Sequence, residues 1–92
     1  MIASFKHKGL KKLFEKGDRR GIRPDLVETV ENILMLMDAA LVPQALDLPR
    51  YHLHQLKGDL AGYWAVTVRA NWRIIFRFEA GTALDVELID YH

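Results

Sequence analysis

The sequence predicts an α+β fold in which two N-terminal helices pack on one face of a small, mostly antiparallel sheet. Two observations lead to this prediction. Between residues 8 and 40, apolar side chains recur at helical spacing. From residue 51 onward, short runs of alternating apolar and polar residues are separated by turn residues, which is typical of an antiparallel meander. The length of 92 residues suits a single domain, 1–92, with one modest core.

The first helix is predicted over residues 8–16, after a short strand candidate at Ile2–Phe5. The residues of its apolar side are Leu10, Leu13 and Phe14. Gly17 suits the end of this helix, because glycine adopts the left-handed conformation without steric cost.

The second helix is predicted over residues 24–40. Pro24 is favoured in a first helical turn, and Asp25 and Glu28 are favourable near the positive end of the helix dipole. The apolar stripe of this helix consists of Leu26, Val30, Ile33, Leu34 and Met37. Residues 43–49 are expected to form a connection to the sheet.

Four strands are predicted in sequence order, with hairpin turns at residues 69–71 and 79–82. They are a short strand around 52–54, followed by 63–68, 72–78 and 84–89. The residues that alternate onto the helix-covered face are Trp64, Val66, Val68, Trp72, Ile74, Phe76, Phe78, Leu84, Val86 and Leu88. On the middle strand, Arg73, Ile75 and Arg77 alternate onto the face that the helices leave open.

Charge is distributed unevenly along a chain whose net charge is only +1. Residues 1–23 carry eight Lys or Arg and two acids, a net +6, and residues 50–78 carry a net +4. Residues 24–49 and 79–92 contain acids and no Lys or Arg, with net charges of −5 and −4. Two basic blocks on one small domain suit a phosphate-binding surface, and the competing interpretation is solvated faces that pair with the acidic blocks.

Several classes of protein are disfavoured by composition. The chain has no cysteine, so neither a disulfide framework nor a thiolate metal site is expected. No apolar run approaches the roughly 18 residues of a membrane span. The first residues lack the charged-then-apolar order of a signal peptide, so a soluble cytosolic protein without membrane contact is expected.

The strand region contains the side chains that metal-free RNA cleavage requires. A base removes the 2′-OH proton, cations stabilise the pentacoordinate phosphate, and an acid protonates the leaving 5′-oxygen. Each acid or base contributes roughly 10²–10⁴-fold, and a charge-stabilising donor roughly 10²–10³-fold. The residues of suitable type are His54, Lys57, Arg73, Asp90, Tyr91 and His92. The competing interpretation for these residues is structural: a satisfied strand histidine, arginine stems that cover aliphatic neighbours, and a polar tail.

A zinc site is a weaker alternative, because no familiar ligand spacing brings its candidate ligands together. These ligands are His52, His54, Asp90 and His92.

Short segments distributed over the whole chain form a recognisable set. They are Phe5-Lys6, Lys8-Gly9-Leu10, Leu13-Phe14, Asp38-Ala39-Ala40, Leu53-His54-Gln55-Leu56-Lys57-Gly58-Asp59, Gly62-Tyr63-Trp64, Trp72-Arg73-Ile74, Phe76-Arg77, Asp85-Val86-Glu87 and Asp90-Tyr91-His92. With these segments the chain resembles the HigB-type toxins of bacterial type II toxin–antitoxin systems, within the RelE/ParE superfamily.

The resemblance implies a RelE-like fold and an endoribonuclease that cleaves messenger RNA on the translating ribosome without a metal or any other cofactor. It also implies a HigA-like helix-turn-helix antitoxin as partner, and operator DNA is contacted only through that complex. By position, it implies that Lys57 and Arg73 hold the phosphate. The implied catalytic group is His54, Asp90, Tyr91 and His92. His54 or Asp90 is then the candidate base, and His92 or Tyr91 the candidate acid.

Two positions depart from the family pattern. Many relatives carry Arg where this chain has Thr67, and Arg69 follows two residues later, where it is expected to share the face of Thr67 and contact substrate. Asn71 stands where Gln is common. It is a candidate for reading a base edge, adenine above all, and the competing interpretation is a turn residue.

The alternative to an enzyme is a binding module of the same superfamily, which acts on DNA gyrase or only binds its antitoxin. The basic N-terminal block has three interpretations: a ribosomal RNA contact, a solvated face or an antitoxin interface. It consists of Lys6, Lys8, Lys11, Lys12, Lys16, Arg19, Arg20 and Arg23.

Overall fold

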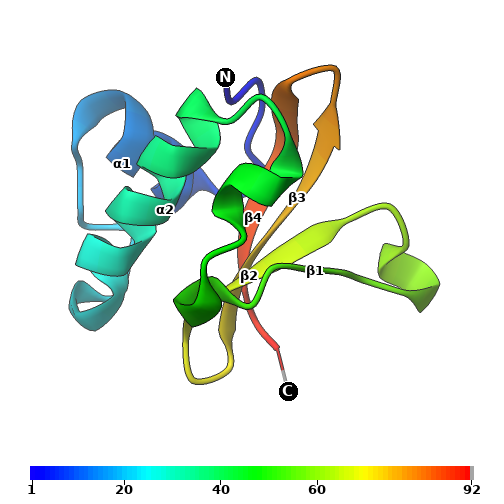
Figure 1. Ribbon diagram of the computed structural model, residues 1–92. Helices are drawn as coiled ribbons and strands as arrows, with labels where there is room; N and C mark the ends of the chain where they lie inside the picture. The colour runs from blue at the N-terminus through cyan, green and yellow to red at the C-terminus, as the bar shows by residue number, and fades with distance from the viewer. Residues whose placement is uncertain (92) are drawn as a thin grey trace.

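A computed structural model describes residues 1–91 and confirms the predicted α+β class. Its elements are α1 (Lys8–Lys16), α2 (Val27–Ala39), β1 (His54–Gln55), β2 (Trp64–Arg69), β3 (Trp72–Glu79) and β4 (Thr82–Asp90). The strands lie in the order β1-β2-β3-β4, and every neighbouring pair is antiparallel. Both helices lie on the same side of this sheet (Figure 1). None of the helices described is long and apolar enough to cross a membrane.

The predicted first strand becomes an interrupted edge rather than a full strand. Ile2 and Phe5 form isolated parallel bridges to Ala83 and Val86 of β4. Between the bridges, Asp85 adopts a positive φ of 53° and donates its backbone N–H to the Ser4 hydroxyl at 2.9 Å. This bend in β4 prevents a continuous ladder, so the N-terminal segment is attached to the sheet at two points.

Because of the same bend, the prediction that Leu84 of β4 faces the helices is wrong. The register between β3 and β4 shifts between the pairs Ile75↔Glu87 and Arg77↔Leu84. A bulge places an extra residue on one strand and breaks the two-residue alternation. As a result, Ala83 lies in the core cluster in place of Leu84, which is only half-buried.

The core lies between the helices and the covered face of the sheet. Its fully buried larger side chains are Phe76, Leu10, Leu26, Ile33, Leu34, Met37, Leu46, Ile74, Val30, Val66 and Val86. The connection after α2 contributes Leu46 to this core through a 3₁₀ turn at Pro43–Leu46. A second 3₁₀ turn at Pro49–Tyr51 buries Tyr51 and leads directly into β1.

The helix boundaries agree with the sequence, with one refinement. The predicted limits of α1 are confirmed, and Gly17 ends that helix with a φ of 67°. Residues Pro24–Leu26 form a 3₁₀ turn, so the second α-helix begins three residues later than predicted, at Val27. Proline fixes φ and lacks an N–H, which suits this tight first turn.

The N-cap of α1 makes the stability of the fold dependent on pH. Nδ1 of His7 accepts a hydrogen bond from the Leu10 N–H at 3.1 Å, which requires an unprotonated Nδ1. Burial lowers the pKa of His7 below 6.5, and the nearby Glu87 carboxylate opposes this effect only in part. The unfolded chain therefore binds the proton more readily, and the free energy of unfolding should fall as the pH drops below about 6.5.

Replacing His7 with Asn tests this cap, because the Asn side chain keeps an acceptor that does not titrate. We expect the His7→Asn variant to match the natural protein at pH 7.5 and to lose less stability by pH 5.5 in urea titrations. The His7→Ala variant should lose about 1 kcal/mol at pH 7.5. Equal pH dependence of the natural protein and His7→Asn would show that the cap does not titrate.

Candidate active site

Of the candidate site residues, His54 and Arg73 lie on the sheet face that the helices leave open. Cross-strand pairing aligns Thr67, Arg73 and Ile89 in one row across β2, β3 and β4. A neighbouring row on the same face runs from His54 through Ala65 and Ile75 to Glu87. His54 and Arg73 therefore project from one face, roughly 10 Å apart across the strands and 7 Å along them.

The tautomer of His54 is set by the chain just before it. His52 ends the preceding 3₁₀ turn in the left-handed conformation, with a φ of 47°. Its carbonyl oxygen lies 2.8 Å from Nδ1 of His54. Because a carbonyl only accepts, Nδ1 donates to it, and in the neutral form of this exposed side chain Nε2 then carries the lone pair.

The two arginines of β3 have different electrostatic surroundings. Arg77 is paired with Glu79 at 2.9 Å and with Asp85 at 3.5 Å. The guanidinium of Arg73 donates instead to the carbonyls of Ala70 and Trp72, and no carboxylate among residues 1–91 lies within ion-pair distance of it. Arg73 is therefore oriented by neutral acceptors and keeps its charge for an anionic ligand.

The C-terminal residues are joined to the β2–β3 turn. The backbone N–H of Tyr91 donates to the Asn71 carbonyl at 2.7 Å, which brings Asn71, Arg73 and Tyr91 to one end of the sheet. Tyr91 is 47% exposed. Asp90 pairs with Trp72, whose side chain packs against the core, so the register places Asp90 on the helix-covered side of this end. His92 lies outside the described residues.

The expectation that Arg69 shares the face of Thr67 is wrong. The register of β2 and β3 shifts after the pair Thr67↔Arg73, and Arg69 pairs with Trp72. The bulge turns Arg69 toward the helix side, where its guanidinium lies 3.7 Å from the Asp25 carboxylate. The open face therefore has no arginine in place of the one that many relatives carry at position 67.

Lys57 lies outside the sheet proper. It precedes the 3₁₀ turn Gly58–Leu60 in the connection from β1 to β2, and it is exposed. It has no hydrogen bond or ion pair with another residue of the described part of the chain. Its ammonium group is thus available in the connection that follows β1, the edge strand of the sheet.

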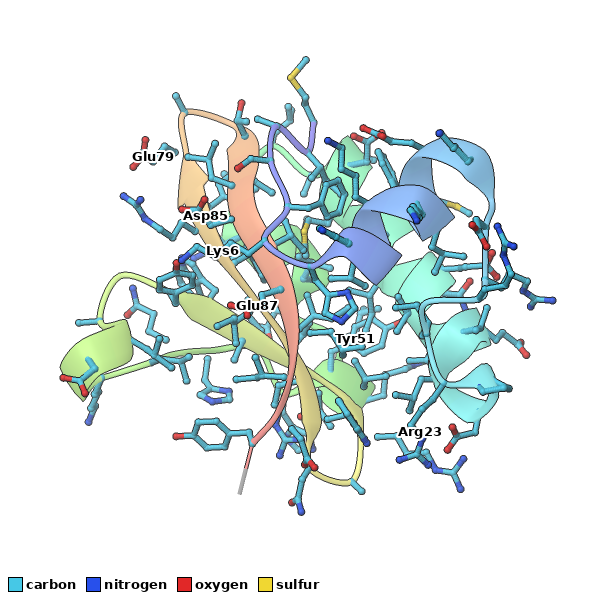
Figure 2. The ribbon with its side chains drawn as sticks, turned by 180° about the vertical axis from the view of Figure 1, so that it is seen from behind. Lys6, Arg23, Tyr51, Glu79, Asp85 and Glu87 are labelled. Carbon is cyan, nitrogen blue, oxygen red and sulfur yellow. The ribbon has the colours of Figure 1, made fainter. Side chains whose placement is uncertain are left out.

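The sequence did not indicate that Lys6 and Tyr63 belong to this face. The Nζ atom of Lys6 donates to the Tyr63 hydroxyl at 2.9 Å and lies 5.5 Å from the centre of its ring. Figure 2 shows Lys6 beside Asp85 and Glu87 on the open face. A contact across 57 residues leaves no local signal in the sequence, although both residues belong to the segments that carry the family resemblance.

Residues 1–91 contain no preformed metal site. No group of three or more His, Asp or Glu side chains there is positioned to hold an ion. The four-ligand alternative also needs His92, which is not among these residues.

Comparison with known proteins places the chain in a family. Residues 3–92 match the profile of a family described as the RelE-like toxin of the type II toxin–antitoxin system HigB. The chain is 50% identical over 92 residues, the full length of both proteins, to a protein of Proteus vulgaris named Endoribonuclease HigB. It is 30% identical over 90 residues to Toxin HigB-1 of Vibrio cholerae serotype O1, covering 96% of this chain and 95% of that one.

Solved structures show the same fold at low sequence identity. YafQ from E. coli aligns with a TM-score of 0.63 and 14% identity, over 96% of this chain and 89% of that one. YoeB from Staphylococcus aureus aligns with a TM-score of 0.57 and 19% identity, over 99% and 94% of the two chains. The RelE-like fold implied by the sequence is thereby confirmed, and the chain belongs to the HigB family of RelE-like toxins of type II toxin–antitoxin systems.

Proposed function

We propose that the chain is an endoribonuclease toxin that inhibits translation by cleaving messenger RNA in the ribosomal A site without a metal ion. The observation that carries this proposal is that one open face presents both the His54 imidazole, whose Nδ1 is held by a carbonyl, and Arg73, which has no ion pair with a carboxylate of residues 1–91. Family membership and the 50% identity to an endoribonuclease support it. The interpretation as a pure binding module explains neither feature.

In the proposed reaction, Nε2 of His54 removes the proton of a ribose 2′-OH. The 2′-oxygen attacks the adjacent phosphorus, and Arg73 and Lys57 stabilise the pentacoordinate phosphate. The 5′-oxygen leaves with a proton from Tyr91 or His92, which yields a 2′,3′-cyclic phosphate and a 5′-hydroxyl. The position of Asp90 on the helix-covered side favours His54 over Asp90 as the base.

Substituting one nucleotide of the RNA tests this chemistry. A 2′-deoxy nucleotide immediately 5′ of the cut removes the attacking group and should abolish cleavage there. The same substitution two nucleotides away serves as the control and should leave cleavage unchanged. Cleavage at the deoxy position would show that water or another group attacks the phosphorus, and would refute the roles proposed here.

An antitoxin partner follows from membership of a toxin–antitoxin family. We propose that it is a HigA-like helix-turn-helix protein and that the complex, rather than the toxin alone, contacts operator DNA. Asn71 is proposed to read a base edge of the codon, since its exposed side chain stands beside Tyr91 and Arg73 at one end of the sheet.

A basic groove beside α1 is proposed to contact the ribosomal RNA backbone. It measures about 410 Å³ and is lined by Lys8, Gly9, Lys12, Asp18, Arg20 and Gly21. Gly9 and Gly21 touch backbone to backbone, so that a Cβ on Gly9 would meet the Gly21 oxygen at 2.5 Å. This contact holds the loop after α1 against the helix. Both guanidinium contacts of Arg20 to the Asp18 carboxylate measure 2.9 Å and fix Arg20 at the groove.

Charge reversal in this groove has a matched control on the same helix. We expect the Lys8→Glu/Lys12→Glu variant to bind ribosomes more weakly and to reduce the slope of log K against log salt by about 2. The Lys11→Glu/Lys16→Glu variant changes the net charge equally but lies outside the groove. Equal effects of the two variants in filter-binding titrations would indicate a general charge effect and no specific contact.

A further inference from the structure

Two of the proposed active-site groups lie on a segment of which only Leu53 is among the residues that pack against the core. Residues 53–63, here called the arm, contain β1 and its connection to β2, and they project away from the helices (Figure 1). The ladder between β1 and β2 has only the pairs His54↔Ala65 and Gln55↔Trp64. The arm carries His54 and Lys57, so its placement determines where the proposed base and this cation lie relative to the rest of the sheet.

Lys6 connects this arm to the opposite edge of the sheet. The backbone of Lys6 is fixed on β4, because its N–H donates to the Val86 carbonyl at 2.9 Å. From there the side chain reaches over the open face to the Tyr63 hydroxyl, which lies 2.9 Å from Nζ. Apart from the local hydrogen bond between His54 Nδ1 and the His52 carbonyl, no other side-chain hydrogen bond or ion pair among the described residues joins the arm to the rest of the chain.

Within the arm, a backbone hydrogen bond links Tyr63 to the residue that precedes Lys57. The carbonyl of Tyr63 accepts a hydrogen bond from the Leu56 N–H at 2.9 Å, and Lys57 is the next residue. The hydrogen bond to Tyr63 raises the pKa of Lys6, and the carboxylates of Asp85 and Glu87 raise it further. The ammonium therefore stays charged throughout the physiological pH range.

We propose that Lys6 and Tyr63 form a latch that holds the arm in place and so positions His54 and Lys57 for RNA cleavage. Lys6 acts in this account as a positioning residue and does not touch the RNA. The inference rests on the proposed endoribonuclease activity. A position error of about 1 Å in a catalytic group costs up to about 10²-fold in rate, so a loose arm would impair the chemical step.

The competing interpretation is that Lys6 binds an RNA phosphate directly. The acids around it argue against this role, since Asp85 and Glu87 would repel a phosphate, whereas no carboxylate among residues 1–91 lies within ion-pair distance of Arg73. The two interpretations predict different results for Tyr63. A direct ligand would be insensitive to loss of the Tyr63 hydroxyl, whereas a latch requires both partners.

The test is a double-mutant cycle with Lys6→Met, Tyr63→Phe and the combined variant, and with Lys11→Met as the control for loss of a surface lysine. Single-turnover cleavage on programmed ribosomes gives the rate constant and the half-saturating concentration, and hydrogen exchange reports on the arm amides. We expect each single variant to lower the rate constant about 10- to 100-fold and the combined variant to be no slower than the singles. Amides of residues 54–63 should exchange faster in Lys6→Met, while core amides and Lys11→Met remain unchanged.

Two results would overturn the latch. One is normal cleavage by Tyr63→Phe together with weaker ribosome saturation by Lys6→Met, which would make Lys6 an RNA ligand. The other is unchanged arm exchange in Lys6→Met. Failure of the natural protein to cleave at all would refute the proposed function instead, and hydrogen exchange would still decide whether the latch holds the arm.

Discussion

Replacing His54 with alanine is expected to lower the cleavage rate constant by about 10²–10⁴-fold, the usual contribution of a general base. The side chain is exposed and its hydrogen bond is to a local carbonyl, so the stability of the fold should change by less than about 0.5 kcal/mol. Single-turnover cleavage by protein with an unchanged unfolding transition measures the effect. The half-saturating ribosome concentration should stay constant.

His52 offers a matched control for this prediction. It is an exposed histidine two residues away, and only its backbone carbonyl takes part in the site. Asparagine tolerates the left-handed conformation at this position, so His52→Asn removes an imidazole while keeping the turn. Normal cleavage by His52→Asn beside the loss in His54→Ala would support the assignment. Comparable losses in both variants would indicate that the turn, and not the His54 base, is responsible.

Removing Tyr91 and His92 is expected to reduce cleavage by about 10²–10⁴-fold as well, because the truncation deletes both candidates for the general acid. The deletion removes the hydrogen bond from the Tyr91 N–H to the Asn71 carbonyl, and such a bond contributes about 1 kcal/mol. Expression of the truncated protein should no longer inhibit cell growth, and the folded protein should no longer cleave RNA in vitro. A folded, truncated protein that still cleaves RNA would refute the assignment of the acid.

Single substitutions then separate the two candidates. Tyr91→Phe removes only the hydroxyl and keeps the backbone bond to Asn71, whereas His92→Ala removes only the terminal imidazole. The variant that reproduces the loss seen in the truncation identifies the proton donor. An RNA whose leaving 5′-oxygen is replaced by sulfur needs little protonation and should restore cleavage by that variant alone.

Local patterns in the sequence predicted most of the fold, because they depend on neighbours along the chain. The limits of α1 follow from apolar spacing and Gly17, and the strand order follows from the short turns between strands. The family resemblance named His54 and Arg73, which the structure places on the open face, and also Asp90, which the register places on the helix-covered side. Their roles remain predictions until the substitutions described above are made.

The sequence could not reveal features that depend on bulges or on contacts between distant residues. Two-residue alternation placed Arg69 on the open face, but the shift in register between β2 and β3 turns it toward Asp25. The bulge at Asp85 exchanged Leu84 for Ala83 in the core in the same way. The contact between Lys6 and Tyr63 joins residues that are far apart in sequence, so no periodicity reports it.

The most direct test of the account is cleavage of a defined messenger RNA on a programmed ribosome. The protein is treated with EDTA, freed of chelator and added to ribosomes with a known codon in the A site. Primer extension then maps the 5′ ends of the products, with free RNA and the His92→Ala variant measured alongside. The account predicts cuts within the A-site codon that require the ribosome, persist after chelation and weaken in the variant if His92 is the acid. An inactive but folded natural protein, or one restored only by added metal, would contradict it, and inhibition of DNA gyrase would be the next assay.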